Sequence, residues 1–182
     1  MKKAYILLAE GFEVVEALAP IDILKRAGVE VVKVAVGNSL DITSSHGHAT
    51  LHCDANINDV DIDDGDTLIL PGGNPGYINL RQSERVCEVV RAYFNANKLI
   101  AAICGAPTVL AYAGIAKGNN ITCHSSVIAE MEGYNYLKQS IVKDGNILTS
   151  SGAGHSITFG IEIAKCLVDG DTLSRTQQGM EL

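Results

Sequence analysis

The sequence predicts an α/β fold in which a mostly parallel sheet is covered by helices on both faces. Short β-branched apolar runs alternate with longer segments that carry apolar residues at helical spacing, which is the pattern of repeated strand–helix units. With 182 residues and 47% hydrophobic content, the chain is long enough for one well-buried core and short for two. Because no linker, repeat or low-complexity stretch interrupts it, we expect one domain over residues 1–182.

The individual elements follow from the same two patterns. A buried strand is expected at Lys3 to Ala9, followed by a helix at Glu13 to Ala27 that ends at Gly28. The other expected strands are Val29 to Val36, Thr67 to Leu70, Leu99 to Ile103 and Ile147 to Thr149. The other expected helices are Glu84 to Asn95, Ala106 to Ala113 and Ser156 to Val168. The polar end from Asp171 to Leu182 predicts no helix, and we expect residues 170–182 to form a mobile tail.

Composition narrows the function classes. The net charge is −7 and Lys and Arg form no cluster, so the chain lacks the basic surface that nucleic acids require. No apolar stretch reaches the roughly 18 residues that span a bilayer. Five cysteines without a C-x-x-C spacing indicate reduced thiols and a cytoplasmic protein.

The candidate chemistry lies where expected strands end, because ligands of such sheets bind beyond the carboxyl ends of the strands. Cys104 follows an apolar run and precedes Gly105 and a helix, which is how a sharp strand-to-helix turn, a nucleophile elbow, presents a reactive residue. The start of that helix would lower the thiol pKa, and the N–H of Gly105 could stabilise an oxyanion. The alternative is that Cys104 is a small buried core residue.

Three further groups have both a functional and a structural interpretation. Gly73, in Pro71-Gly72-Gly73, either reverses the chain or aims a peptide N–H at a bound oxygen. Glu16 either complements the helix dipole or, in its apolar setting, takes up a proton and donates a hydrogen bond to a thiolate. His124 either relays a proton or is an ordinary hydrogen-bonding residue.

Three histidines, at positions 46, 48 and 52, share parity along the chain. If that segment is extended, all three face one side. A surface metal site there is conceivable, but exposed strand histidines are ordinary and parity does not establish a coordination geometry. We therefore assign no metal site.

The ordered motifs together resemble the DJ-one/ThiJ branch of the DJ-one/ThiJ/PfpI superfamily over nearly the whole chain. They are Gly11-x-Glu13-x-x-Glu16, Leu70-Pro71-Gly72-Gly73-Asn74, Ala101-Ala102-Ile103-Cys104-x-x-Pro107, Thr122-x-His124 and Leu148-Thr149-Ser150-x-Gly152. The resemblance implies a flavodoxin-like three-layer sandwich and a homodimer. It also implies a protonated Glu16 bonded to a reactive Cys104, an oxyanion site at the Gly73 and Gly105 amides, and His124 nearby.

The resemblance further implies a cofactor-independent glyoxalase or deglycase, a glyoxalase III-like lyase or hydrolase that converts 2-oxoaldehydes such as methylglyoxal to 2-hydroxy acids. The alternatives are an oxidative-stress sensor that acts through oxidation of Cys104 and a redox-regulated chaperone. Peptidase activity is not expected, because Gly105 stands where the protease-like branch carries its histidine. We expect a small aldehyde substrate and no nucleic-acid or membrane partner.

Overall fold

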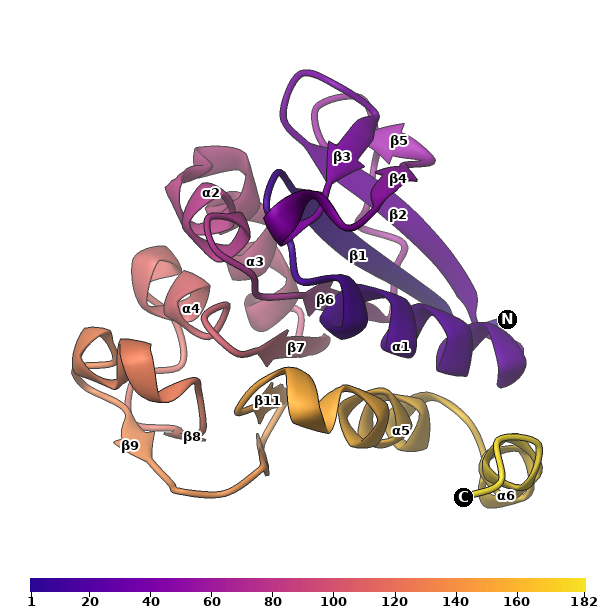
Figure 1. Ribbon diagram of the computed structural model, residues 1–182. Helices are drawn as coiled ribbons and strands as arrows, with labels where there is room; N and C mark the ends of the chain where they lie inside the picture. The colour runs from indigo at the N-terminus through magenta and orange to yellow at the C-terminus, as the bar shows by residue number, and fades with distance from the viewer.

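Seven strands form the central sheet, in the spatial order β10-β11-β7-β6-β1-β2-β5. The computed structural model describes all 182 residues (Figure 1). All neighbouring strands are parallel except β10, which pairs antiparallel with β11. The strands are β1 (Lys3–Ala9), β2 (Glu30–Val36), β5 (Ala55–Asn56), β6 (Thr67–Leu70), β7 (Leu99–Ile103), β10 (Ile141–Asp144) and β11 (Ile147–Ser150).

Helices cover both faces of this sheet (Figure 1). One face carries α1 (Val14–Arg26) and α5 (Ser156–Leu167), which lie side by side. The opposite face carries α2 (Gly76–Gln82), α3 (Glu84–Asn95) and α4 (Thr108–Ala113). The remaining elements are short: β3 (Asp41–Thr43) with β4 (Thr50–His52), β8 (Asn120–Ile121) with β9 (Asn135–Tyr136), and the 3-10 turns η1 (Ser45–Gly47), η2 (Ser125–Glu130) and η3 (Ala153–His155). No helix has the length and apolar character that crossing a membrane requires.

The first strand shows how the sequence produces two cores. Successive side chains of a strand point to opposite faces. Ile6 and Leu8 therefore pack with α1 and α5, whereas Tyr5 and Leu7 pack with α3 and α4. All four are at most 1% exposed, and burying each such side chain contributes about 1.5–3 kcal/mol. A run that is apolar at every position is thus what a strand covered on both faces requires.

The structure confirms the predicted α/β class and the mostly parallel sheet, and most predicted elements lie within one or two residues of their expected bounds. Helix α4 begins at Thr108, two residues later than expected, because residues 104–107 form turns. The prediction that the polar end has no helix was wrong: α6 spans Gly170–Gln178. The Asp169 carboxylate caps it by accepting the N–H of Thr172 at 2.8 Å, and Leu173 packs on the core.

The condition for a shared histidine face, an extended segment, is not met. The chain around His46 is a 3-10 turn in which His46 has a φ of 61°, so the segment is not extended. His52 lies on β4 and its Nδ1 bonds the Asp41 carboxylate at 2.7 Å. His46 and His48 contact each other, with ring centroids 5.6 Å apart, and the three imidazoles do not share one side of a strand.

Candidate active site

The site lies where the order of the strands changes direction. β2 follows β1 on one side, whereas β6 continues the sheet on the other side of β1, and such a switch point opens a crevice at the strands' carboxyl ends. The loops after β1 and β6 are joined there by backbone hydrogen bonds. Glu13 N–H donates to the carbonyl of Gly72 at 2.9 Å, and Gly76 N–H donates to that of Gly11 at 3.1 Å. Cys104 follows β7, the next strand of the sheet.

Cys104 has the backbone of a nucleophile elbow. Its φ is 64°, in the left-handed region that costs a residue with a side chain about 1–3 kcal/mol. Two flanking segments hold this conformation: the Cys104 N–H donates to the carbonyl of Ser150 at 2.9 Å, and its carbonyl accepts from the N–H of His124 at 2.8 Å. The elbow directs the half-buried thiol into the crevice instead of into the core.

Two backbone N–H groups, those of Gly73 and Gly105, donate to the Cys104 sulfur. Both positions need glycine. Gly73 has a φ of 93°, and a Cβ there would lie 2.3 Å from the backbone N of Glu13; a Cβ on Gly105 would lie 2.6 Å from Cδ1 of Tyr77. The loops are therefore packed so closely that only bare backbone fits beside the sulfur, and both N–H groups are placed to stabilise a negative charge there.

Glu16 is the buried carboxyl of the site, with no exposed surface. Its Oε2 accepts the N–H of Gly72 at 2.8 Å, whereas Oε1 has no hydrogen-bond partner. A Cβ on Gly72 would lie 2.6 Å from Glu16 Oε2 and 2.7 Å from Cys104 Cβ, so the two side chains meet across this glycine. An unpartnered carboxylate oxygen in such a place is costly, and a proton on Oε1 removes that cost.

The electrostatics of this pair favour a proton on Glu16. Burial raises the pKa of Glu16 from its ordinary 4.5 to about 7, and the charge of Glu13 adds to this, against the lowering effects of the Gly72 N–H and of Cys104. Burial first, and then an ionised Glu16, raise the pKa of Cys104 to about 12, against the smaller lowering effects of the N–H groups of Gly105 and Gly73. Protonation of Glu16 removes its charge and turns it into a donor toward the sulfur.

His124 lies at the rim of the site and is exposed. Its Nδ1 accepts the N–H of Ser126 at 3.2 Å and lies 2.8 Å from the Ser126 hydroxyl. Because Nδ1 is the acceptor, the neutral ring carries its proton on Nε2. The ring is thus held with one N–H available, and it is not a direct partner of the sulfur.

These groups line one pocket of about 340 Å³. The five positions predicted from sequence all border it: Glu16, Gly73, Cys104, Gly105 and His124. No role was assigned from the sequence to the other residues of its wall, which are Glu13, Asn74, Tyr77, Ser126 and Ala153. Among these residues, only Glu13 could have been found from a local sequence pattern, because it lies about one helical turn before Glu16.

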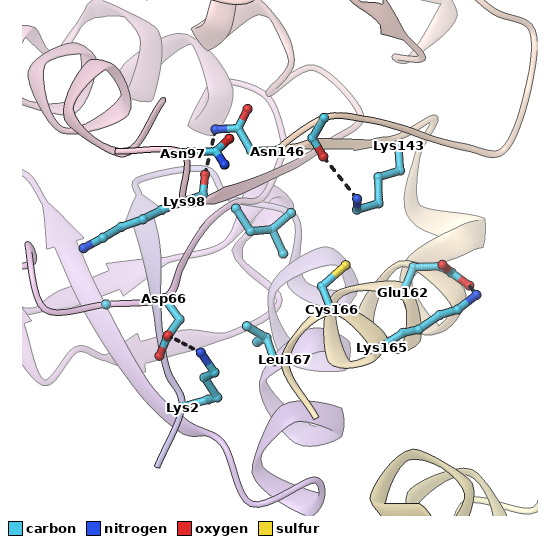
Figure 2. A pocket seen from close by; sticks show the side chains of 13 residues that line it. Lys2, Asp66, Asn97, Lys98, Lys143, Asn146, Glu162, Lys165, Cys166 and Leu167 are labelled. Atoms are coloured by element: carbon cyan, nitrogen blue, oxygen red, sulfur yellow. Dashed lines mark hydrogen bonds and ion pairs between the residues drawn. The ribbon is translucent and has the colours of Figure 1, made fainter. Parts of the chain in front are cut away.

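A larger hollow of about 840 Å³ opens at the opposite end of the sheet (Figure 2). Its lysines already have partners: Lys2 pairs with Asp66 at 2.7 Å, and Lys143 donates to the carbonyl of Gly145 at 3.1 Å. The side chain of Lys98 extends away from the other lining residues (Figure 2). None of the predicted site residues lies there, so size does not identify the reactive site.

The fold and the site define an α/β protein whose cysteine, on a strand-to-helix elbow, meets a buried carboxyl and two backbone donors. Residues 2–166 match the model of the DJ-1/PfpI family, and the chain belongs to this family. The chain is similar to protein dj-1beta of Drosophila melanogaster, with 33% identity over 98% of this chain and 96% of that protein. The crystal structure of that protein superimposes with a TM-score of 0.95 at 32% identity, covering 100% of this chain and 98% of the other.

A Thermococcus kodakarensis relative that is named a deglycase is 33% identical to this chain, over 91% of this chain and 99% of that protein. The DJ-1/PfpI family therefore includes a relative of this chain that is named a deglycase.

Proposed function

We propose that this protein is a cysteine-dependent, cofactor-independent enzyme that converts 2-oxoaldehydes such as methylglyoxal to 2-hydroxy acids. The observation that carries the proposal is the set of groups around the Cys104 sulfur: two backbone N–H donors and a buried carboxyl whose Oε1 is unpartnered. Three donors around one sulfur stabilise a thiolate, and the same backbone donors suit an oxyanion. The relative named a deglycase supports an enzymatic role for the site.

The first step is attack of the Cys104 thiolate on the aldehyde carbon. A C–S bond forms, the carbonyl π electrons move to oxygen, and the Gly73 and Gly105 N–H groups bind the resulting oxyanion. Glu16 gives its proton to this oxygen, which yields a neutral hemithioacetal and leaves Glu16 as a carboxylate placed to act as a base.

The second step moves a proton between the two carbons. The Glu16 carboxylate removes the proton from the former aldehyde carbon, which gives an enediolate with its negative charge on the oxygen of the second carbon. The hydroxyl proton on the first carbon shifts to that oxygen, Glu16 returns its proton to the second carbon, and the first carbon becomes the carbonyl of a thioester, so that the first carbon is oxidised and the second reduced. The Nε2–H of His124 donates to the oxygen of the second carbon. Water then cleaves the thioester, releasing the 2-hydroxy acid and regenerating the thiol.

Lactate formation from methylglyoxal, without glutathione or metal, tests this proposal. Wild type is expected to form lactate, and Cys104→Ser and Glu16→Ala are expected to lose it by at least about a hundredfold. Cys166→Ser is the matched control, because this exposed cysteine lies outside the pocket. An inert wild type, or turnover that survives Cys104→Ser, contradicts the proposal.

The same surroundings favour a second function, sensing of oxidants. A half-buried thiolate reached from a pocket is open to oxidation, and a protonated Glu16 would hydrogen-bond the sulfinate that forms. Peroxide should then add two oxygen atoms to the mass of Cys104 in wild type. With Glu16→Ala we expect oxidation to run on to the sulfonic acid; a stable sulfinate in that variant contradicts the role of Glu16.

We also propose that the protein is a homodimer whose contact lies beside the pocket. Val15 and Leu18 of α1 and Ile157 of α5 are 46%, 40% and 49% exposed. They border an apolar hollow of about 360 Å³. Ala153 lines both this hollow and the pocket of Cys104, so a second copy of the chain seated here would close one side of the site and bury the exposed apolar side chains.

A further inference from the structure

Tyr77 forms the wall of the pocket next to the oxyanion donors. It lies in the first turn of α2, and its ring faces Gly105 so closely that a Cβ there would lie between 2.6 and 2.9 Å from three ring carbons. Gly105 is one of the two residues whose N–H groups reach the Cys104 sulfur. A group bound at the sulfur and directed toward α2 therefore meets the Tyr77 ring.

Arg81 contacts this ring. Tyr77 and Arg81 are four residues apart on α2 and so share one helix face. The guanidinium carbon of Arg81 lies 5.2 Å from the ring centroid of Tyr77 and 4.7 Å from that of Tyr112. Both distances are those of cation–π contacts, so the cation is shared between two aromatic rings.

An ion pair also holds the Arg81 side chain in place. It is only 11% exposed, and it pairs with the Glu130 carboxylate through Nη1. Tyr112 belongs to α4, which follows the elbow, and Glu130 ends η2, the turn that begins just after His124. One guanidinium thus connects the three segments that carry Tyr77, the helix after Cys104, and the turn after His124.

We infer that Tyr77 limits the size of the group that can stand on the carbon bonded to Cys104, and that Arg81 is the positioning residue that keeps the ring in place. In what it says of the substrate, this inference rests on the proposed function. It predicts that the enzyme prefers small 2-oxoaldehydes, which carry hydrogen or methyl on the second carbonyl carbon, to 2-oxoaldehydes that carry an aryl group there. The wall itself acts on any reagent that approaches the sulfur, whether or not the protein turns over an aldehyde.

The test compares the alkylation of Cys104 by a small reagent, iodoacetamide, and a bulky one, N-phenylmaleimide, with each rate followed by mass spectrometry of the Cys104 peptide. Tyr77→Ala is expected to raise the bulky-to-small rate ratio roughly tenfold, the scale on which a pocket discriminates by size. Tyr77→Phe keeps the ring and is expected to keep the ratio. If Tyr77→Ala leaves the ratio unchanged, or if Tyr77→Phe raises it as much, the inference is overturned.

The role of Arg81 is tested through Tyr77. Arg81→Ala should raise the same ratio, and the double variant Tyr77→Ala/Arg81→Ala should match Tyr77→Ala alone, because Arg81 acts only through the ring. Arg85→Ala removes an arginine that pairs only with exposed Glu88 on its own helix, and it should leave the ratio at the wild-type value. A double variant whose ratio exceeds that of Tyr77→Ala contradicts the positioning role.

Two readouts separate the possible failures. The thermal midpoint of each variant shows whether a changed ratio accompanies loss of the fold, and only folded variants at the assay temperature enter the comparison. Lactate formation is measured separately in wild type. An absence of lactate with an unchanged alkylation result contradicts the proposed reaction alone, whereas lactate formation with no effect of Tyr77→Ala contradicts the wall alone.

Discussion

The carboxyl of Glu16 and the thiol of Cys104 meet across the bare Cα of Gly72, which leaves room for both side chains and for no Cβ of its own. One carboxyl oxygen is held by the Gly72 N–H, and the other has no hydrogen-bond partner. We therefore expect the pair to titrate as one unit, in which the buried acid takes up the proton that leaves the thiol.

The first prediction concerns stability against pH. Because the pKa of Glu16 is raised from 4.5 to about 7 in the folded protein, the folded state binds this proton more tightly than the unfolded state does. The stability that this bound proton contributes is fully present at pH values below the pKa of Glu16 in the unfolded chain. It is lost as the pH rises through the pKa of Glu16 in the folded protein, and the loss is at most about 3 kcal/mol. Urea unfolding of wild type and Glu16→Gln at about pH 5 and about pH 8 should show a smaller loss in the variant.

The second prediction concerns the glycine between the pair. Gly72→Ala places a Cβ 2.6 Å from Glu16 Oε2 and 2.7 Å from Cys104 Cβ, so we expect about 1–3 kcal/mol of lost stability from overpacking and slower Cys104 alkylation. Gly154→Ala is the matched control, because nothing lies within 4 Å of the added atom. Thermal unfolding and alkylation rates check both, and equal behaviour of the two variants counts against the packing described.

The third prediction separates His124 from the thiol. Since His124 bonds Ser126 and not the sulfur, His124→Ala should lower lactate formation roughly a hundredfold while Cys104 alkylation keeps its wild-type rate. His52→Ala, on a different strand and paired with Asp41, should affect neither. A His124→Ala variant with normal turnover removes this residue from the mechanism.

The fourth prediction addresses the dimer. A charge in the lining of the apolar hollow, as in Leu18→Glu, should convert a dimer into a monomer because an unpaired charge there would be buried. Leu40→Glu is a suitable control, since Leu40 is similarly exposed at 37% and lies outside the hollow. Sedimentation equilibrium measures both, and a monomeric wild type contradicts the proposed contact.

The sequence predicted the elements that have a strong local pattern. Strand runs such as Leu99–Ile103 are apolar at every position, and the loops that follow them carry Gly73, Cys104 and Gly105, so both the sheet and the elbow could be placed. Helix α2 could not, because it begins among Asn74, Pro75 and Gly76 and has only seven residues. Packing on α3 and α4, more than propensity, stabilises it.

The same limit explains the missed walls of the pocket. Arg81 contacts Tyr112, which is 31 positions away in the chain, and Glu130, which is 49 positions away. No local sequence pattern predicts contacts between residues so far apart. Helix α6 was missed because its residues are polar, and its stability depends on one carboxylate cap and on Leu173 reaching the core.

The most direct test of the account is the pH dependence of Cys104 alkylation by iodoacetamide. Burial and an ionised Glu16 raise the pKa of Cys104, whereas a protonated Glu16 and the two backbone N–H donors favour the thiolate, so the account predicts an alkylation midpoint below that of an ordinary thiol, about 8.5. Glu16→Gln keeps a donor and should stay reactive, whereas Glu16→Ala should react at least about tenfold more slowly at pH 7. A wild-type midpoint above that of an ordinary thiol, about 8.5, would show that Glu16 does not hold the proton and would contradict the mechanism.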